Sequence, residues 1–369
     1  MKSDVSRRKV LKGSGAALLA APAAGAGIPG PRMEGPGTPK ICLEMGSGGV
    51  AAGAFTDAGI RRLRQLGVNY ALTVGPPIPW READIRARID QLKAGGITLY
   101  NMMIGGYPKT LYGRPGRDEE IDKVRQSLRA AGKAGLAVVE HNFYAHRAVE
   151  GYYGAKGRAG SGYTGFDYER MKNLPPLEQE GVHSLEEMWA NITYFLKAVI
   201  PVAEEAGVRM ALHPNDPPAP VSRGSGQIMG TLAGWKKLIG IVNSPANGIT
   251  FDCGVTREMG EDPVEVCRYF ASRDRINHVH FRNVRVEKPY EKYEEVFIDE
   301  GQVDMFGVMK ELVRNKYTRT IYPEHPRAID YDLEHPAFHT VYPGGGGYAA
   351  YAFNVGYAKA MQQAALASV

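Results

Sequence analysis

Short apolar runs alternate with longer amphipathic stretches along most of the chain. The apolar runs have the length and composition of buried strands, whereas the amphipathic stretches repeat apolar residues every three or four positions, as helices do. Several amphipathic stretches end at glycine, the residue preferred just beyond a helix. Eight runs are predicted strands: residues 40–46, 69–74, 97–105, 136–144, 208–214, 248–254, 276–284 and 319–325.

Eight strands that alternate with helices are typical of an α/β fold, the single (β/α)8 barrel. The competing architecture is an open doubly wound sheet, but no G-x-G-x-x-G turn follows the first predicted strand. We therefore expect one barrel domain over residues 40–369, closed by a C-terminal helix. The Gly- and Tyr-rich residues 145–182 form a long loop after the fourth strand, where barrels carry active-site lids, although a mobile surface insertion fits equally well.

The N-terminus resembles a twin-arginine export signal. Arg7 and Arg8 lie in a Ser-Arg-Arg-x-Val-Leu-Lys pattern, and a weakly apolar stretch with small residues at 21–26 follows. We expect a signal over residues 1–26, a Pro/Gly-rich linker over 27–39 and a periplasmic location. A disordered basic tail is the alternative interpretation. Because twin-arginine export moves folded proteins, this route suits a protein that is loaded with metal in the cytoplasm.

Charge and cysteine content limit the classes of function that this chain can have. The 369-residue chain has a formal net charge of +5, but removing residues 1–26 leaves 40 basic against 39 acidic residues. No basic patch for nucleic acid is therefore expected, and no apolar run is long enough for stable membrane insertion. The three cysteines form no C-x-x-C pair, so at least one free thiol remains to be explained.

The predicted strands five to eight each end near a side chain that can bind a metal. In a barrel these ends meet at the catalytic mouth. Imidazole, thiolate and carboxylate together suit Mn, Fe, Co or Zn, and metal binding would explain a free thiol. Each residue taken singly also has a structural explanation, and His278 is either a neighbour of the ligands or an alternative ligand. The expected metal ligands are His213, Cys253, His280 and Glu324.

Other polar residues near the same strand ends could bind substrate or carry protons. A guanidinium matches the two oxygens of a carboxylate, which makes Arg282 the expected clamp for an acidic substrate. His325 titrates near neutral pH beside a predicted ligand, so it is the expected acid or base. The expected substrate-binding residues are Asn142, Asp216 and Arg282.

Several motifs together resemble the mannonate dehydratases, metal-dependent barrels of the xylose-isomerase-like superfamily. These motifs read "FLKAVIPVAEEAGVRMALHPNDPP", "FDCGV", "HVHFRNV", "YPEHP" and "YPGGGGYAAYAFNVGYAKAM". His-Pro-x-Asp-Pro-Pro is the most specific of them. The resemblance is strongest from about residue 185 to the end and weaker over residues 40–145.

The resemblance implies dehydration of D-mannonate to 2-keto-3-deoxy-D-gluconate with Mn(II). The family uses His, Cys, His and Asp as ligands, which fall on His213, Cys253, His280 and, where the family has Asp, Glu324. A histidine and a tyrosine carry protons in the family. These match His325 and Tyr348, with Tyr342 and Tyr351 close enough to compete for the second role.

The sequence also departs from the family pattern. Glu324 is one methylene longer than the family's Asp, Pro326 replaces a Gly, and the segment after the fourth strand differs. A sugar isomerase or epimerase of the same superfamily therefore remains an alternative, as does an exported sugar-acid binding protein without catalysis. A small-molecule sugar acid is the expected partner, and homo-oligomerisation is left open.

Overall fold

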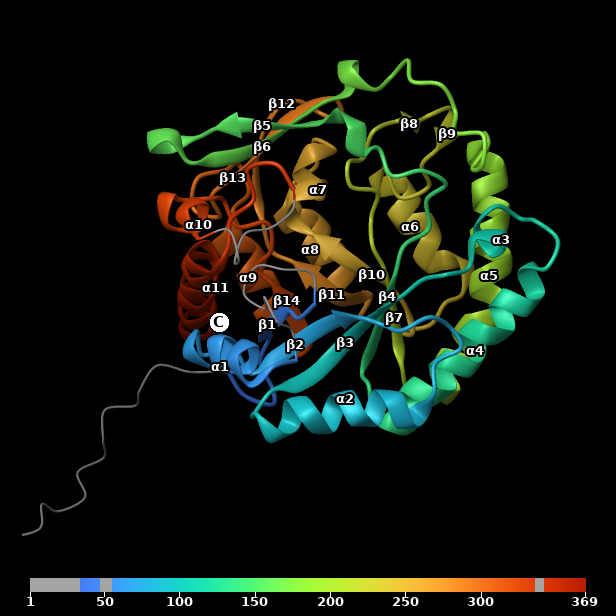
Figure 1. Ribbon diagram of the computed structural model, residues 1–369, viewed down its shortest axis with the longest axis horizontal. Helices are drawn as coiled ribbons and strands as arrows, with labels where there is room; N and C mark the ends of the chain where they lie inside the picture. Colours follow the sequence, from blue (N-terminus) through green and yellow to red (C-terminus); the bar gives the residue numbers. More distant parts are fainter. Residues whose placement is uncertain (1–33, 47–54, 336–341) are drawn as a thin grey trace, which may run out of the picture. The chain divides into compact units, whose positions relative to one another are not determined.

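The computed structural model describes residues 34–46, 55–335 and 342–369. The predicted export signal and most of the predicted linker lie outside these residues. Eight parallel strands close into a barrel in the order β1-β14-β11-β10-β7-β4-β3-β2 (Figure 1). The barrel strands are β1 (Lys40–Glu44), β2 (Tyr70–Val74), β3 (Thr98–Ile104), β4 (Val138–His141), β7 (Arg209–Leu212), β10 (Asn247–Asp252), β11 (Ile276–His280) and β14 (Thr320–Tyr322).

The barrel confirms the fold predicted from the sequence, since every predicted strand overlaps one barrel strand. The predicted strand 276–284 combines the barrel strand β11 with the start of a strand outside the barrel. The chain leaves the barrel after His280 and resumes at Asn283 as β12, a strand of another sheet. Register aligns the ends of the last strands, because Asp252 pairs with His280 and His280 pairs with Tyr322. Polar side chains from three strands therefore meet at one level.

Helices surround the barrel on its outside (Figure 1). One of the longest, α5, begins with a capping box formed by Ser184 and Glu187. The helices are α1 (Asp57–Gln65), α2 (Glu82–Ala94), α3 (Pro108–Leu111), α4 (Arg117–Ala134), α5 (Leu185–Glu205), α6 (Leu232–Ile241), α7 (Cys253–Glu258), α8 (Pro263–Ala271), α9 (Met305–Arg314), α10 (Asp330–Glu334) and α11 (Tyr348–Ser368). The last of them is the predicted C-terminal helix.

A second, antiparallel sheet is built from two connections that are far apart in the sequence. Its order is β12-β13-β6-β5, which we call the rim sheet. The long segment after β4 supplies β5 (Tyr152–Lys156) and β6 (Gly162–Asp167), and the segment after β11 supplies β12 (Asn283–Lys288) and β13 (Lys292–Val296). The predicted loop 145–182 thus contains ordered strands. A small hairpin, β8 (Val221–Ser222) and β9 (Ser225–Gly226), follows β7.

A large apolar cluster fills the space between the barrel strands and the helices. Smaller clusters lie under the rim sheet, where Phe166 stacks on Tyr293 with ring centroids 5.1 Å apart. The rim sheet therefore has small apolar clusters of its own, separate from the large cluster of the barrel. Within the described residues, none of the helices combines the length and apolar character needed to cross a membrane.

Candidate active site and metal centre

A polar cavity of about 210 Å³ opens at the carboxyl ends of the barrel strands, where barrel enzymes keep their catalytic groups. Six predicted site residues line it: Asn142, His213, Asp216, His280, Glu324 and His325. The predicted residues outside its lining are Cys253, Arg282 and Tyr348. The cavity also contains residues that the sequence analysis did not assign, among them Glu44, Glu140, Tyr144, Arg147 and Tyr322.

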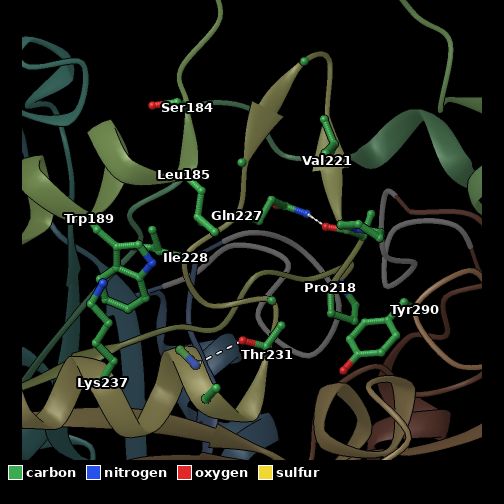
Figure 2. A pocket seen from close by; sticks show the side chains of 17 residues that line it. Ser184, Leu185, Trp189, Pro218, Val221, Gln227, Ile228, Thr231, Lys237 and Tyr290 are labelled. Carbon is green, nitrogen blue, oxygen red and sulfur yellow. Dashed lines mark hydrogen bonds between the residues drawn. The ribbon is translucent and has the colours of Figure 1, made fainter.

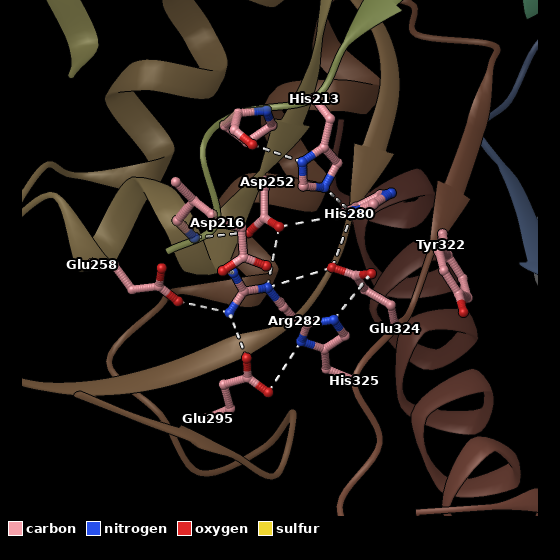
Figure 3. Close-up of polar contacts among 12 residues, drawn as sticks. His213, Asp216, Asp252, Glu258, His280, Arg282, Glu295, Tyr322, Glu324 and His325 are labelled. Carbon is pink, nitrogen blue, oxygen red and sulfur yellow. Dashed lines mark hydrogen bonds and ion pairs between the residues drawn. The ribbon is translucent and has the colours of Figure 1, made fainter. Parts of the chain in front are cut away.

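Two predicted ligands, His213 and His280, face each other in this cavity (Figure 3). Nε2 of His213 lies 3.2 Å from Nδ1 of His280. The other nitrogen of His213 lies 2.8 Å from the carbonyl oxygen of Pro214, and it must be the donor there because a carbonyl only accepts. Burial lowers the pKa of His213 to about 3, so the ring is neutral. Neutral imidazole is the form that binds metals.

Glu324, the predicted carboxylate ligand, lies beside His280. Its Oε1 is 2.9 Å from Nδ1 of His280. Burial opposes ionisation of the carboxyl group, but His280 and His325 outweigh burial and hold the pKa of Glu324 well below its usual value. The extra methylene relative to aspartate does not prevent the carboxylate from reaching the imidazole. Glu324 therefore stays a proposed ligand.

The strand β10 brings Asp252 to the site, where the sequence predicts Cys253. The ligand atoms of His213, Asp252 and His280 all lie within 4.8 Å of one another. Cys253 begins α7, is fully buried in the large apolar cluster and joins neither group of metal-binding side chains found among the described residues. Burial also raises the pKa of its thiol well above the ordinary value, so the thiol keeps its proton unless a metal ion binds it. Adjacent residues at a strand end point to opposite sides, so a one-residue offset exchanges a ligand for a core residue.

A second group of ligand types lies nearby and shares His280. Glu140, His278 and His280 also place their ligand atoms within 4.8 Å of one another. The carboxylate of Glu140 already accepts hydrogen bonds from Asn101 and Thr250, at 2.9 and 2.8 Å. It lies 3.5 Å from Nε2 of His280. We therefore interpret Glu140 as a residue that holds the His280 ring, while His278 contacts Thr320 at 3.0 Å and remains the alternative ligand.

Arg282 is fully buried among carboxylates and does not line the cavity. Its guanidinium lies 2.7 Å from Glu258, 3.1 Å from Asp252 and 3.5 Å from Asp216 (Figure 3). These carboxylates occupy the positions that a substrate carboxylate would need. The structure thus places Arg282 behind the ligands, where it neutralises buried acids.

Arg147 brings a guanidinium to the cavity itself. It lies in the segment after β4, and 46% of its side chain is exposed. Nε donates a 2.9 Å hydrogen bond to the carbonyl oxygen of Asp216, and Nη2 is 3.6 Å from that residue's carboxylate. No motif in the sequence distinguishes Arg147 from other arginines in this segment, so only the fold identifies it as a cation at the mouth.

His325 lines the cavity next to Glu324, as the sequence predicts. Its Nε2 lies 3.5 Å from Glu324, and its Nδ1 lies 3.0 Å from Glu295 of the rim sheet. Burial lowers the pKa of His325, but the two carboxylates outweigh it and the net shift is upward. Glu295 is a further residue that sequence reasoning missed, since β13 carries no motif.

Tyr348 lies at the first turn of α11, away from the cavity lining. Its hydroxyl is within 3.4 Å of the carbonyl oxygen of Arg62 and 3.3 Å of Gln65, both on α1. The competing residue Tyr342 lies beside His325, with ring centroids 5.0 Å apart and ring planes tilted by 40°. The structure therefore does not bring the predicted pair His325 and Tyr348 together.

Two other phenols line the cavity instead, Tyr144 and Tyr322. The hydroxyl of Tyr322 is 2.8 Å from that of Tyr351, the second competing residue. Burial raises the pKa of both cavity tyrosines, so each keeps its proton at neutral pH. Either could donate a proton or a hydrogen bond to a ligand.

Asn142 and Asp216 both face the cavity, as expected for substrate-binding residues. Oδ1 of Asn142 is buried without a hydrogen-bond partner. Asp216 accepts a 2.6 Å hydrogen bond from the hydroxyl of Tyr152, which belongs to the rim sheet. The Arg282 and Arg147 guanidinium groups outweigh burial and lower the pKa of Asp216, so it is ionised.

The donor set fits a divalent cation. Imidazole nitrogens and carboxylate oxygens converge in a buried space, and this mixture suits Mn, Fe, Co or Zn. Among the buried ligand atoms in the region, Nε2 of His278 has no hydrogen-bond partner, and Oε1 of Glu324 has only ion-pair contacts with His280 and Arg282, at 2.9 and 3.4 Å without hydrogen-bond geometry. Buried polar atoms are normally satisfied, so these atoms support an ion as the missing partner.

A larger hollow of about 800 Å³ lies elsewhere, between α5, the β8–β9 hairpin and α6 (Figure 2). It is mostly apolar, and its lining includes Trp189, Ile228 and Tyr290. Lys237 lies over the Trp189 ring, 4.1 Å from its centroid. Since Lys237 is the one charged residue in the lining, this hollow lacks the groups needed for acid–base or metal chemistry.

Comparison with solved structures supports the barrel fold. Mannonate dehydratase from Streptococcus suis serotype 2 superposes with a TM-score of 0.78 at 26% identity, covering 90% of this chain and 94% of that one. A xylose isomerase domain protein from Planctomyces limnophilus has a TM-score of 0.56 at 13% identity, over 90% of this chain and 99% of its own. The second similarity shows the fold alone.

Sequence comparison reaches the same family. The family model described as D-mannonate dehydratase (UxuA) matches residues 158–367. Mannonate dehydratase from Enterococcus faecalis is 31% identical over 322 residues, which cover 75% of this chain and 88% of the relative. The Thermotoga maritima protein of the same name is 30% identical over 309 residues, or 74% and 84% of the two chains. The chain belongs to the D-mannonate dehydratase family.

Proposed function

We propose that this protein is a metal-dependent hydro-lyase that removes water from D-mannonate or a closely related sugar acid. The observation that carries the proposal is the convergence of His213, Asp252 and His280 at the strand ends, beside a cavity that the two histidines line together with an arginine. Family membership supports the same chemistry. A 2,3-dihydroxy acid needs a cation near its carboxylate and groups that move a proton at each of two carbons.

Arg147 would bind the substrate carboxylate. Its planar guanidinium can donate two parallel hydrogen bonds to a carboxylate, and much of its side chain is free of protein contacts. Asn142 and Asp216 would hold the substrate hydroxyls. This assignment replaces the expected role of Arg282, whose donors are directed at buried carboxylates.

The metal would be held by His213, Asp252 and His280, with Glu324 as a fourth ligand. We expect Mn(II) from the family resemblance, with Fe(II), Co(II) and Zn(II) as alternatives that the donor types also allow. A bound divalent cation would supply positive charge that stabilises negative charge developing next to the substrate carboxylate. Glu140 would keep the His280 ring in place through its contact at 3.5 Å.

Proton transfer would involve His325. Dehydration removes a proton from C2 and adds one to the leaving C3 hydroxyl, so a group that can gain or lose a proton must lie at the cavity wall. His325 lies there, while Tyr144 and Tyr322 keep their protons and could assist as donors. Changing His325 to Asn should leave bound metal in place and lower turnover by roughly 100-fold or more.

The deciding experiment is proton NMR in D2O with the Mn-loaded protein, sampled after quenching, against D-mannonate and related aldonates. A 3-deoxy methylene signal is expected with the unaltered protein and not with His325→Asn. Deuterium at C2 without loss of water would contradict dehydration and favour an isomerase or epimerase. A purified protein that neither contains nor binds Mn, Fe, Co or Zn would instead support a sugar-acid binding protein without catalysis.

We also propose that the protein is exported. Support comes from the Arg7–Arg8 pair and the small residues that follow it. Replacing both arginines with lysine should stop periplasmic accumulation, which fractionation and immunoblotting would measure. Unchanged accumulation would contradict twin-arginine export and leave the basic-tail interpretation.

A further inference from the structure

The turn that carries His325 is held by the rim sheet. His325 has a φ of +47°, in the left-handed region that non-glycine residues rarely adopt. Such a conformation is strained and persists where the surroundings enforce it, often at functional sites. The contacts that enforce it here should therefore matter for function.

Arg327 fixes the backbone of this turn. It is fully buried, and its Nε donates a 2.9 Å hydrogen bond to the carbonyl oxygen of His325. Its Nη1 donates a 2.6 Å hydrogen bond to Thr164 on β6, and its Nη2 lies 3.0 Å from Glu295 on β13. One arginine thus ties the turn to two paired strands of the rim sheet.

Glu295 fixes the ring of the same residue. Its side chain is 2% exposed, and its Oε2 lies 3.0 Å from Nδ1 of His325. The two atoms lie within hydrogen-bonding distance, although the angles at this contact do not meet hydrogen-bond geometry. Such contacts are often misaligned without substrate and tighten when it binds. With Nδ1 held on this side, Nε2 is left on the side of Glu324, 3.5 Å away at the cavity wall (Figure 3).

We propose that Glu295 is a positioning residue that holds the His325 ring by Nδ1 and presents Nε2 to the substrate. The rim sheet then has a definite task, since it supplies the residue that orients the proton carrier. This inference rests on the proposed dehydratase function for its kinetic consequence. The orientation of the ring itself does not depend on which substrate is used.

The neighbouring residue on β13 offers a matched control. Glu294 carries the same carboxylate on the other face of the strand, where its side chain is 35% exposed and lies 3.6 Å from Arg285. Glu295→Gln and Glu294→Gln therefore make the same chemical change one residue apart. Glu295→Asp keeps the negative charge but shortens the side chain by one methylene, which moves the carboxylate away from His325.

The kinetic test compares these Mn-loaded variants on the aldonate that the unaltered protein dehydrates. Glu295→Gln should lower kcat by roughly 10- to 100-fold, the usual cost of losing such a supporting contact, with KM and bound metal within about threefold. Glu295→Asp should recover part of the loss, and Glu294→Gln should behave as the unaltered protein. Equal kcat values for Glu294→Gln and Glu295→Gln would overturn the proposal. If Glu295→Gln does not fold, an unchanged kcat in Glu295→Asp would overturn it as well.

A spectroscopic test separates this inference from the proposed function. In ¹⁵N-histidine-labelled protein without paramagnetic metal, the Nδ1 resonance of His325, assigned with His325→Gln, should shift in Glu295→Gln and stay in place in Glu294→Gln. An unmoved resonance would overturn the positioning role even if dehydration is found. A shifted resonance in a protein that dehydrates no aldonate would support the positioning role and contradict the proposed function alone.

Discussion

The buried cluster around Arg282 and the cavity rim around Arg147 each place a guanidinium beside Asp216, yet their surroundings differ. The Arg282 side chain is 1% exposed and contacts Asp252 and Glu258, whereas 46% of the Arg147 side chain is exposed. A guanidinium enclosed by carboxylates has a structural role, and one with free donors at a cavity can bind a ligand. The neighbours of an arginine, more than its place in a motif, decide its role.

The largest expected effect comes from removing the enclosed arginine. Arg282→Gln would leave Asp252 and Glu258 buried without their cation, so we expect a loss of about 3–5 kcal/mol in the free energy of unfolding. Urea unfolding followed by circular dichroism measures it. Arg285→Gln, on an exposed face of β12, is the control. A loss equal to that of the control would show that the cluster around Arg282 is not structural.

The next effect concerns the residue that links this cluster to the metal. Asp252→Asn keeps the size of the side chain and the cap of α7 but removes a charged ligand. Mn(II) affinity should therefore fall by about 100-fold or more, whereas losing a supporting residue typically costs 10- to 100-fold. Cys253→Ala should leave affinity unchanged and only lower stability. Titration calorimetry or metal analysis after dialysis compares the two. Loss of metal in Cys253→Ala alone would restore Cys253 as the ligand.

Arg147 should affect substrate binding more than stability. Arg147→Gln removes charge-assisted hydrogen bonds to a carboxylate, which contribute about 1.5–3 kcal/mol. We expect kcat/KM to fall by roughly 10- to 100-fold, mainly through a higher KM, while the unfolding free energy falls less than in Arg282→Gln because Asp216 keeps its second cation. Arg158→Gln, in the connection between β5 and β6, is the control, since its side chain is 44% exposed. An unchanged KM would remove Arg147 from substrate binding.

His141 extends the comparison to a titratable group that is buried without an ion partner. Its Nδ1 has no hydrogen-bond partner, and burial lowers its pKa to about 3. Between about pH 6.5 and pH 3 the unfolded chain binds a proton that the folded protein does not, so stability should decrease as pH falls through this window. The slope from one such group is at most about 1.4 kcal/mol per pH unit.

His141→Gln should therefore show a flatter pH dependence of unfolding free energy than the unaltered protein. Urea unfolding at pH 7, 6 and 5 measures the difference, and His335→Gln on the surface is the control. Parallel curves for the unaltered protein and His141→Gln would mean that His141 is protonated in the folded state.

The sequence predicts the barrel well because strand and helix periods are local properties of the chain. It also places His213, His280, Glu324 and His325 at the cavity, since each directly ends or follows a strand. It predicts Cys253 as the ligand at β10, where we propose Asp252, because local patterns do not fix a strand end to within one residue, and alternation makes that one residue decisive.

Other parts of the site depend on contacts between distant segments. Arg282 is a chemically sensible clamp until the carboxylates around it are known, and these come from different elements of the fold. Arg147 and Glu295 carry no motif: the segment after β4 brings Arg147 to the cavity, and the rim sheet brings Glu295 to His325. Tyr348 follows the family pattern but begins a helix whose first turn lies against α1. Such contacts cannot be deduced from local sequence.

The rim sheet has a consequence for the order of folding. Its central pair joins β6 to β13, which are separated by several barrel strands in the sequence, so this pair forms only after a long loop has closed. Barrel strands that are consecutive in sequence can pair sooner. Refolding protein should therefore regain the signal of its consecutively paired barrel strands before its catalytic activity, because both β13, which carries Glu295, and the closing pair of β1 and β14 wait for long loops to close.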